Sequence, residues 1–276
     1  MPVEAQPRGK ILIVGGSSSI GTALHPLTSK FAPTLTAGRT GCDIFLDLAA
    51  PLENLTLSEN IDVIIHNAAD FGGPSVEEMI EAGNINVIGT LKIYAADVRA
   101  RAKHLTFTSS ILSSLTGEAE SYSSYSLSKR HAEEFARLYC FRDGMPLTIL
   151  KPSQVYGNQD TFRKHQPLLY GILDAAESQG DIHIHGTHDA CKNFIHIDDL
   201  TAVILRVIQA RPTGTYVCVH PKNSTCMQIA KTALRSFNNI GNISFLASEQ
   251  SVRDTIFEVD HSLYKLLEFY PQISIE

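Results

Sequence analysis

The sequence predicts an α/β protein built on a doubly wound parallel sheet, with a smaller lobe formed by the carboxyl-terminal part of the chain. The first half alternates short apolar runs with longer amphipathic stretches. The run Lys10–Val14 is apolar at consecutive positions, which is typical of a strand buried on both faces. After about Pro152 this alternation gives way to a mixed pattern. Strand–helix–strand alternation indicates a parallel sheet with helices on both sides.

The expected elements follow in chain order. The strands of the sheet are expected at residues 10–14, 34–36, 44–46, 62–66, 105–108 and 147–150, and its helices at 20–30, 76–101 and 125–141. Residues 156–180 are expected to form loop and helix. Strands are expected at 181–186 and 215–219, and a helix at 198–210 that begins at Asp198 or Asp199. We expect residues 1–155, joined by 192–212, to form the sheet domain, and 156–191 with 213–276 to form the lobe.

Composition narrows the classes of function. The 276 residues hold 23 Lys and Arg against 29 Asp and Glu, so the net charge of −6 argues against binding nucleic acid through a broad basic field. No apolar run approaches the roughly 20 residues that span a bilayer. Residues 1–7 lack the pattern of a secretion signal, so a cytoplasmic location is expected. Five widely spaced cysteines without a C-x-x-C pair indicate free thiols. The cluster of His183, His185 and His188 is interpreted as part of the fold, so no metal is expected.

A glycine-rich turn follows the first expected strand. The segment Gly15–Gly21 has the order strand, glycine turn, helix that dinucleotide-binding folds use, so the domain is expected to be of Rossmann type. Gly15 permits a tight turn, and Gly21 lets the helix pack closely on the sheet. The helix N-terminus would face a pyrophosphate. The alternative is a turn of small residues without a ligand. The residues expected to bind the cofactor here are Gly15, Ser17, Ser18, Ser19, Ile20 and Gly21.

The second expected strand bears on the choice of dinucleotide. NAD-specific sites usually place an acid about 20 residues beyond the glycine turn, but residues 36–40 contain none. Arg39 could instead pair with a 2′-phosphate, which favours NADP and leaves NAD possible. The alternative is a solvated surface arginine. Asp47, followed by Leu48, could hydrogen-bond the adenine amino group or could simply cap a turn.

A tyrosine and a lysine four residues apart form the candidate catalytic pair. On a helix, Tyr125 and Lys129 lie one turn apart on the same face. A cation beside the phenol favours the tyrosinate, so the pKa of Tyr125 is expected to fall from about 10 and make it a general acid–base. Lys129 could also hold the nicotinamide ribose. Ser109 and Ser110 directly follow the strand expected at 105–108, and a hydroxyl at this strand end can bind a substrate carbonyl.

These segments together resemble the extended short-chain dehydrogenase/reductase family of NAD-dependent epimerases and dehydratases, to which nucleotide-sugar epimerases and ketoreductases belong. The resemblance covers nearly the whole chain. Its most specific parts are Leu150–Gly157 and Asn193–Leu200, which are similar to the family's R-P-x-x-V-Y-G and R-D-F-I-H-V-x-D motifs. The other matching segments are 15–21, 62–69, 86–90, 108–110 and 125–129.

The resemblance implies roles for further residues. Tyr125 would exchange the proton and Ser110, or Ser109, would orient the carbonyl. The resemblance also places Asn86 near the nicotinamide, as one of the catalytic residues. Arg163 could contact a substrate diphosphate, or it could lie in a solvated loop. Lys192 replaces the arginine of the family motif as a phosphate binder. A homodimer through the helix at 125–141 is also expected. The remaining residues expected to line the cofactor groove are Asn67, Ala68, Ala69, Pro152 and Val155.

Some positions depart from the family pattern. Ser18 stands where the family has its middle glycine, the V-Y-G after the serine strand is replaced, and the interval from Ser110 to Tyr125 is short. The Thr-Asp-Glu motif of sugar dehydratases is absent. The expected function is therefore NAD(P)-dependent epimerisation or reduction of a small-molecule substrate, a nucleotide-linked sugar. One alternative is a dinucleotide-binding regulatory subunit without activity. Another is an NADPH-dependent reductase of a non-nucleotide ketone.

Overall fold

A computed structural model describes residues 9–52, 60–100, 102–117, 119, 121–247 and 251–275. Residues 1–7, on which the interpretation of the amino terminus depends, lie outside the described residues. The chain divides into two compact units. The first holds residues 1–152, 200–218 and 260–269, and the second holds 153–199, 219–259 and 270–276.

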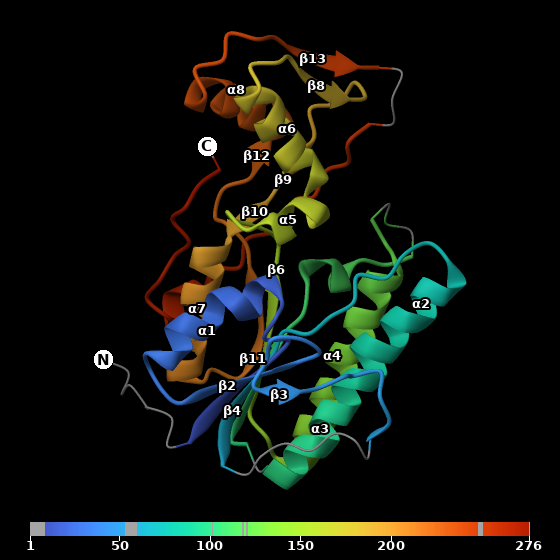
Figure 1. Cartoon of the computed structure of the whole chain (residues 1–276), viewed down its shortest axis with the longest axis vertical. Helices are drawn as coiled ribbons and strands as arrows, with labels where there is room; N and C mark the ends of the chain where they lie inside the picture. Colours follow the sequence, from blue (N-terminus) through green and yellow to red (C-terminus); the bar gives the residue numbers. More distant parts are fainter. Residues whose placement is uncertain are drawn as a thin grey trace. The chain divides into compact units, whose positions relative to one another are not determined.

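A seven-stranded parallel sheet forms the centre of the first unit (Figure 1). Its strand order is β11-β6-β5-β4-β1-β2-β3, with every neighbouring pair parallel. All residues of β4 and β5 are buried, the polar ones as well as the apolar ones. The predicted fold class is confirmed. The strands are β1 (Lys10–Val14), β2 (Thr34–Gly38), β3 (Ile44–Phe45), β4 (Ile61–His66), β5 (His104–Thr108), β6 (Leu147–Pro152) and β11 (Gly214–Cys218).

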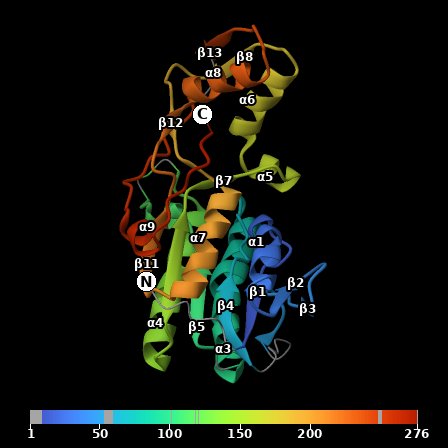
Figure 2. The ribbon, with the colours of Figure 1, turned by 90° about the vertical axis from the view of Figure 1, so that its left-hand side faces the viewer.

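Helices cover both faces of this sheet. Figures 1 and 2 show α1 (Ser19–Ser29) and α7 (Ile197–Ala210) on one side, and α3 (Gly89–Ala100) and α4 (Ser124–Asp143) on the other. The helix expected at 76–101 is interrupted. It consists of α2 (Val76–Ala82), a π-helix η2 (Gly83–Ile88) and α3. A 3₁₀ turn η3 (Ile111–Ser114) and α9 (Ser262–Leu266) complete the unit.

The core of this unit lies between the sheet and the helices α3 and α4. Buried strand residues such as Leu12, Ile64 and Phe107 pack with Tyr94 of α3 and Ala132 of α4. Burying such side chains contributes about 1.5–3 kcal/mol each, which fixes α4 against the sheet. The carboxyl ends of β1, β4 and β5 and the first turns of α4 are therefore held in one rigid layer.

The second unit is built from short strands and helices. Its two-stranded sheets pair β10 with β7, β12 with β9 and β13 with β8. The helices are α5 (Asp160–His165), α6 (Pro167–Glu177) and α8 (Cys226–Ser236). The strands are β7 (Gln154–Tyr156), β8 (Ile182–His185), β9 (Cys191–Lys192), β10 (Phe194–His196), β12 (Ser224–Thr225) and β13 (Ile243–Leu246).

The boundaries between the units differ from the expected ones at residues 153–155, 192–199, 213–218 and 260–269. Residues 214–218 were expected in the lobe but form β11, which pairs with β6 at the edge of the main sheet. Residues 192–199 were expected with the sheet but group with the second unit. The reason is strand pairing: β10 bonds to β7 within the second unit, whereas β11 extends the first.

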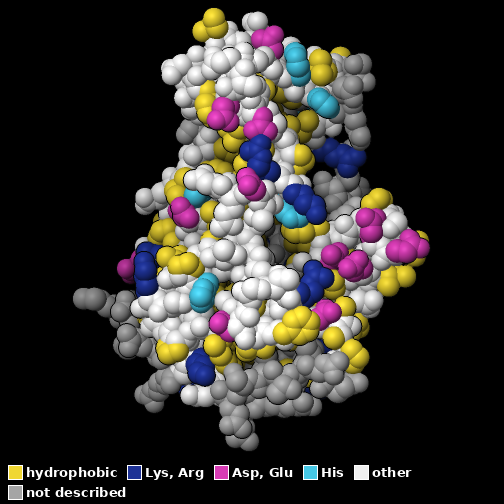
Figure 3. Space-filling model, viewed as in Figure 1, with side chains coloured by type: hydrophobic (Ala, Val, Ile, Leu, Met, Phe, Trp, Pro, Cys, Tyr) yellow, Lys and Arg dark blue, Asp and Glu magenta, His cyan; other side chains and the backbone are white. Residues whose placement is uncertain are grey.

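Among the described residues, no helix is long and apolar enough to cross a membrane. Across the same part of the chain, His, Cys, Asp and Glu side chains form no group of three or more that could hold a metal ion. All five cysteines carry free thiols. On the face shown in Figure 3, acidic and hydrophobic side chains gather over α2, where Val76 and Ile80 are exposed.

Candidate active site

The glycine turn after β1 has the backbone geometry that only glycine allows. Gly15 adopts a φ of +82°, and a Cβ on it would lie 2.6 Å from the backbone nitrogen of Ala68. A Cβ on Gly21 would lie 2.3 Å from the carbonyl oxygen of Gly15. Ser18 caps α1, because its Oγ accepts a hydrogen bond of 3.1 Å from the Gly21 nitrogen. Ser18 therefore fits the turn by directing its side chain onto the helix.

A pocket of about 220 Å³ adjoins this turn. Eight residues expected to bind the cofactor line it: Gly15, Ser17, Ser18, Arg39, Asp47, Leu48, Ala68 and Ala69. Four others, Ser19, Ile20, Gly21 and Asn67, support the turn or the strand end without lining the pocket. Glycines that no larger residue could replace and a helix N-terminus at the wall are what a dinucleotide pyrophosphate requires. The residues present therefore fit NAD or NADP. The other lining residues are Val14, Ala37, Gly38, Leu46, Asp70 and Ile85.

The end of β2 presents a cation to this pocket. Arg39 is exposed at the wall, whereas the acid nearest to it along the chain, Asp43, is held elsewhere. The Asp43 carboxylate accepts hydrogen bonds of 2.8 Å from both the nitrogen and the hydroxyl of Thr36. These bonds hold the pKa of Asp43 below its usual value. Asp47 accepts from the Ala49 nitrogen at 3.0 Å, so it caps a turn and also lines the pocket.

Asn67 joins the ends of two neighbouring strands. Its Oδ1 accepts a hydrogen bond of 2.5 Å from the Thr108 hydroxyl, and its backbone nitrogen donates to Val14. The Nδ2 atom is buried and has no hydrogen-bond partner among the described residues. Asn67 thus fixes the carboxyl ends of β4 and β5 beside each other, and its Nδ2 donor stays unpaired among the described residues.

Tyr125 and Ser110 meet at the beginning of α4. The Ser110 hydroxyl hydrogen-bonds the Tyr125 phenol, and its oxygen also accepts from the Leu112 nitrogen at 3.2 Å as the cap of η3. Burial raises the pKa of Tyr125 to about 12, and the bond to Ser110 opposes this only in part. The expectation that the pKa of Tyr125 falls is therefore wrong for this structure. Desolvation of the phenol outweighs the hydrogen bond with Ser110.

Lys129 lies one turn further along α4 and is fully buried. Its side chain is 1% exposed, its Nζ donates to the Thr108 carbonyl at 2.8 Å, and it lies 4.3 Å from the centre of the Phe107 ring. Burial lowers the pKa of Lys129 to about 7, with Glu133 acting in the opposite sense. The Lys129 amine is thus able to lose or gain a proton near neutral pH.

Ser109 and Ser110 point to different partners. Ser109 donates a hydrogen bond of 2.6 Å to Glu133, whereas Ser110 meets Tyr125. Ser110 is thus the hydroxyl beside the phenol, whereas Ser109 faces Glu133. The sequence analysis missed Glu133. Its signal was an acid four residues after Lys129 on a helix face that otherwise carries Ala132 and Ala136.

Asn86 lies in the π-helix η2 and is occupied by structural bonds. Its Nδ2 donates to the Asp70 carbonyl at 2.7 Å and to the Ser128 hydroxyl at 2.9 Å. Its Oδ1 accepts from the Asp70 nitrogen at 2.7 Å. Both amide hydrogens and the amide oxygen are thus engaged by the loop after β4 and by α4. In this structure Asn86 joins the loop to the helix that carries Tyr125, rather than presenting a free group.

The loop after β4 places an aromatic ring on Tyr125. Phe71 stacks on the phenol with ring centres 5.0 Å apart and planes inclined by 22°, while 52% of its own surface stays exposed. The Asp70 carboxylate accepts from the Gly72 nitrogen at 2.7 Å, and the Ser124 hydroxyl donates to the Gly73 carbonyl. The sequence analysis gave no role to Phe71, which has no motif and depends on the loop conformation.

The candidate residues of the second unit have local partners. Arg163 forms an ion pair with Asp174 and lies over the Tyr170 ring at 5.1 Å. Lys192 in β9 is 7% exposed and donates to the Thr255 hydroxyl at 3.1 Å. Burial lowers the pKa of Lys192. Pro152 ends β6 in the first unit, and Val155 lies in β7 of the second.

Comparison with known proteins identifies the family. Residues 11–218 match the model of the NAD dependent epimerase/dehydratase family. The chain belongs to this family. A curated relative, the CDP-abequose synthase of Salmonella typhimurium, is 24% identical over 160 residues, which cover 58% of this chain and 52% of that protein. The chain thus spans about half the length of the first curated relatives that it matches.

Solved structures share the fold over almost the whole chain. The UDP-glucose 4-epimerase of Thermotoga maritima, determined with UDP-glucose, has a TM-score of 0.75 at 17% identity and covers 96% of this chain and 94% of its own. RMD from Pseudomonas aeruginosa, complexed with NADPH, has a TM-score of 0.78 at 16% identity and covers 97% and 95%. These likenesses establish the Rossmann-type architecture.

Proposed function

We propose that the protein is an NAD(P)-dependent oxidoreductase or epimerase that acts on one carbon of a nucleotide-linked sugar. The observation that carries the proposal is the hydrogen bond between Tyr125 and Ser110 beside the buried Lys129. The segment from Ala68 to Phe71 connects this group to the dinucleotide pocket, because its first residues line the pocket and Phe71 stacks on Tyr125. Relatives in the family that bind UDP-glucose or NADPH support the choice of substrate and cofactor.

The residues of the chain have separate roles in the proposed reaction. The bound nicotinamide supplies or accepts the hydride at the sugar carbon. Ser110 donates a hydrogen bond to the substrate oxygen, and Tyr125 gives its proton to that oxygen during reduction or takes it during oxidation. Removing this proton from a phenol of pKa about 12 requires stabilisation of the tyrosinate, which a charged Lys129 provides. Lys129 would also hold the nicotinamide ribose.

The binding residues favour NADPH and net reduction of a keto sugar. Arg39 at the pocket wall can pair with a 2′-phosphate, and Asp43 is engaged by Thr36 rather than free to bond a ribose. The glycine turn would hold the pyrophosphate, and Asn67 has a buried donor free for a ligand. Ser18 lends no support to the alternative of an inactive regulatory subunit, because its hydroxyl caps α1. Arg163 and Lys192 stay proposed as contacts of the substrate phosphates, and a cytoplasmic location stays a prediction.

The first experiment identifies the cofactor. The purified protein is denatured and any released nucleotide is assayed, and native protein is titrated with NADPH and NADH by fluorescence. Preferential binding of NADPH supports the reductase, whereas tightly bound NAD supports the epimerase and refutes the role given to Arg39. Binding of neither contradicts the proposal.

The second experiment tests the chemistry. Turnover is followed with UDP-glucose and with nucleotide-linked 4-keto sugars, for wild type and for Tyr125→Phe. The variant is expected to lose about 10²–10⁴-fold in kcat while the Kd for NADPH stays near the wild-type value, because only the phenol hydroxyl is removed. Unchanged turnover in the variant would refute the mechanism.

We also propose that the protein is a homodimer through α4. Phe135, Leu138 and Phe141 of this helix are 39%, 64% and 87% exposed, which is unusual for large apolar side chains on one helix. Sedimentation of wild type and Leu138→Glu tests this, with a monomeric variant as the expected result. A monomeric wild type would refute it.

A further inference from the structure

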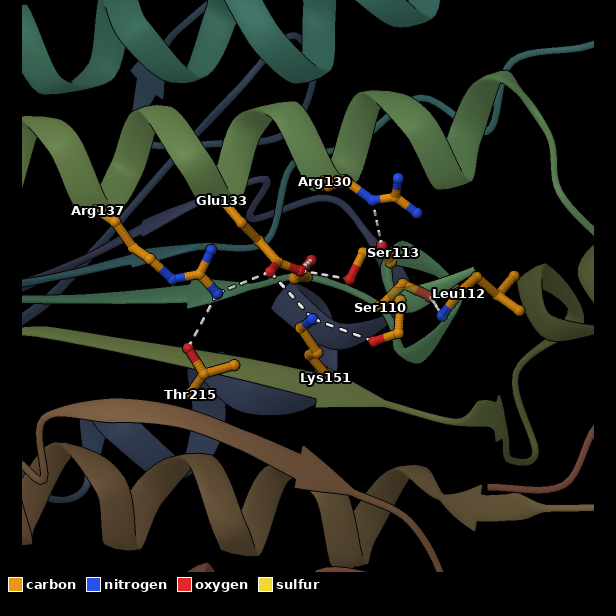
Figure 4. Close-up of polar contacts among 10 residues, drawn as sticks. Ser110, Leu112, Ser113, Arg130, Glu133, Arg137, Lys151 and Thr215 are labelled. Carbon is orange, nitrogen blue, oxygen red and sulfur yellow. Dashed lines mark hydrogen bonds and ion pairs between the residues drawn. The ribbon is translucent and has the colours of Figure 1, made fainter. Parts of the chain in front are cut away.

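A buried carboxylate lies next to the segment that carries Ser110. Glu133 of α4 is 2% exposed, and its Oε1 accepts hydrogen bonds from the hydroxyls of Ser109 at 2.6 Å and Ser113 at 2.5 Å. Its Oε2 forms ion pairs with Arg137 at 3.0 Å and Lys151 at 3.1 Å. Figure 4 shows this carboxylate between the helix, the η3 turn and strand β6. Removing one partner of such a buried group is costly, so this arrangement is rigid.

Residues on both sides of Ser110 are hydrogen-bonded to Glu133. Ser109 precedes it and Ser113 follows it by three residues, so the short segment that carries the Ser110 hydroxyl is attached at both ends to one carboxylate. Arg130 of the same helix adds a hydrogen bond of 2.9 Å from its Nε to the Ser113 carbonyl. Because α4 also carries Tyr125, these contacts set the position of Ser110 relative to the phenol.

The same carboxylate acts on Lys129 through its charge. Lys129 and Glu133 lie one turn apart on α4, and the negative charge raises the pKa of the lysine against the opposite effect of burial. The groups that face Lys129 from other elements are uncharged: His66 of β4, whose pKa lies well below its usual value, and the Phe107 ring and Thr108 carbonyl of β5. The uncharged Tyr125 phenol lies one turn before it on α4.

The charges that face Glu133 leave it ionised. Burial alone would raise the pKa of Glu133, but hydrogen bonds from Ser109 and Ser113 and the charge of Lys151 outweigh burial and lower it. Arg137 reaches the carboxylate from the outer side of α4 with a side chain 46% exposed. Around neutral pH the carboxylate is therefore a fixed negative charge beside the lysine.

We propose that Glu133 is a positioning residue for the site: it holds the Ser110 hydroxyl against Tyr125 through Ser109 and Ser113, and it places a fixed negative charge one turn from Lys129 on α4. The part that concerns catalysis rests on the proposed function. The part that concerns Lys129 is a property of the folded chain and can be measured without substrate.

The charge effect is tested by nuclear magnetic resonance. The protein is labelled with ¹³C at the lysine ε-carbons, the Lys129 signal is assigned by its absence in Lys129→Met, and its pKa is read from a pH titration. In Glu133→Gln this pKa is expected to fall by about one unit, because the amide keeps the shape of the group and removes the charge. The matched control is Arg137→Gln, which alters the same cluster on the same helix. There the pKa is expected to stay or rise, and an unchanged value in Glu133→Gln overturns the proposal.

The positioning effect is tested by kinetics with the nucleotide sugar that wild type turns over. Ser113→Ala removes one anchor and keeps the charge, so kcat is expected to fall about 10–100-fold with KM nearly unchanged. In a Ser110→Ala background the same change is expected to have no further effect, since it acts through Ser110. Equal losses in both backgrounds overturn the positioning role.

The proposed function and the role of Glu133 can be refuted separately. Absence of turnover by wild type with every nucleotide sugar refutes the proposed function, while the Lys129 titration still decides the role of the Glu133 charge. If Glu133→Gln does not fold, the double variant Glu133→Gln/Arg137→Gln replaces it in the titration, because removing Arg137 leaves one cation fewer without its partner. A Lys129 pKa lower than in Arg137→Gln alone remains the expected result, and an equal pKa overturns the proposal.

Discussion

Replacing Lys129 by methionine is expected to make the folded protein more stable at pH 6 while abolishing its chemistry. Methionine fills a similar volume and carries no charge. The wild-type protein instead buries an ammonium that is 1% exposed. Groups that serve a site and strain the fold are common where function and stability compete.

The size of the effect follows from the pKa of the lysine. Burial lowers it from 10.5 to about 7, and this difference of about 3.5 corresponds to about 5 kcal/mol of penalty on the charged form. Methionine removes the penalty, but it deprives the Thr108 carbonyl of its donor, at about 1–3 kcal/mol, and loses the contact with the Phe107 ring, at about 0.5–2 kcal/mol. The net gain in the free energy of unfolding at pH 6 is therefore about 2 kcal/mol.

The sign of the pH dependence is fixed by the direction of this pKa change. Below about pH 7 the lysine is charged in both the folded and the unfolded chain, so the full penalty applies. As the pH rises above 7, only the folded chain loses the proton, and the penalty shrinks until it disappears above 10.5. The advantage of the variant should thus fall by about 3 kcal/mol between pH 7 and 9.5, and should reverse in sign.

Urea denaturation of wild type and Lys129→Met at pH 6, 7, 8 and 9.5 measures this difference. Because both proteins share every other titrating group, their difference isolates Lys129. Exposed Lys103→Met, on the same unit, serves as the control and should show no comparable pH dependence. A stability difference that stays constant from pH 6 to 9.5 would show that Lys129 keeps its proton throughout, and would refute the reasoning.

Three further predictions concern the walls of the site. Arg39→Ala should weaken NADPH binding at least tenfold and leave NADH binding unchanged by fluorescence titration, since only the 2′-phosphate loses its partner; equal losses would contradict this. Phe71→Ala should expose the Tyr125 phenol and lower its pKa from about 12, seen as an ultraviolet titration step absent from Tyr125→Phe; an unmoved step would exclude shielding. Ser18→Gly should change the Kd for NADPH less than threefold and cost a few tenths of a kcal/mol, because a glycine cap replaces a serine cap; a large gain in affinity would mean that Ser18 obstructs the phosphates.

The sheet could be predicted because its strands are buried on both faces. The run at residues 11–14 is apolar at every position, so no knowledge of its neighbours is needed. The second unit gave no such signal. Strand β9 has two residues and pairs with β12 more than 30 residues away, so its existence depends on tertiary contact rather than local pattern. For the same reason β11 was assigned to the wrong side of the boundary, because only its pairing with β6 places it.

The candidate site divides in the same way. Tyr125, Lys129 and the glycine turn could be found because helix spacing and backbone sterics are local properties. Successive residues at a strand end point to opposite sides, so Ser109 and Ser110 could be distinguished only by their partners, of which Glu133 is one. The pKa of Tyr125 was misjudged because spacing reveals a neighbouring charge but not how much water the fold removes.

The π-helix between α2 and α3 constrains how this sequence can change over evolutionary time. A π turn corresponds to one residue inserted into an α-helix, and here that turn brings Asn86 to the interior. Deleting a residue from Gly83–Ile88 would restore regular winding, but it would rotate everything before it by about 100° relative to α3. The amide would then leave Asp70, and Phe71 would lose its support over the phenol. Chains that keep this chemistry are thus expected to vary by substitution here and to resist changes in length.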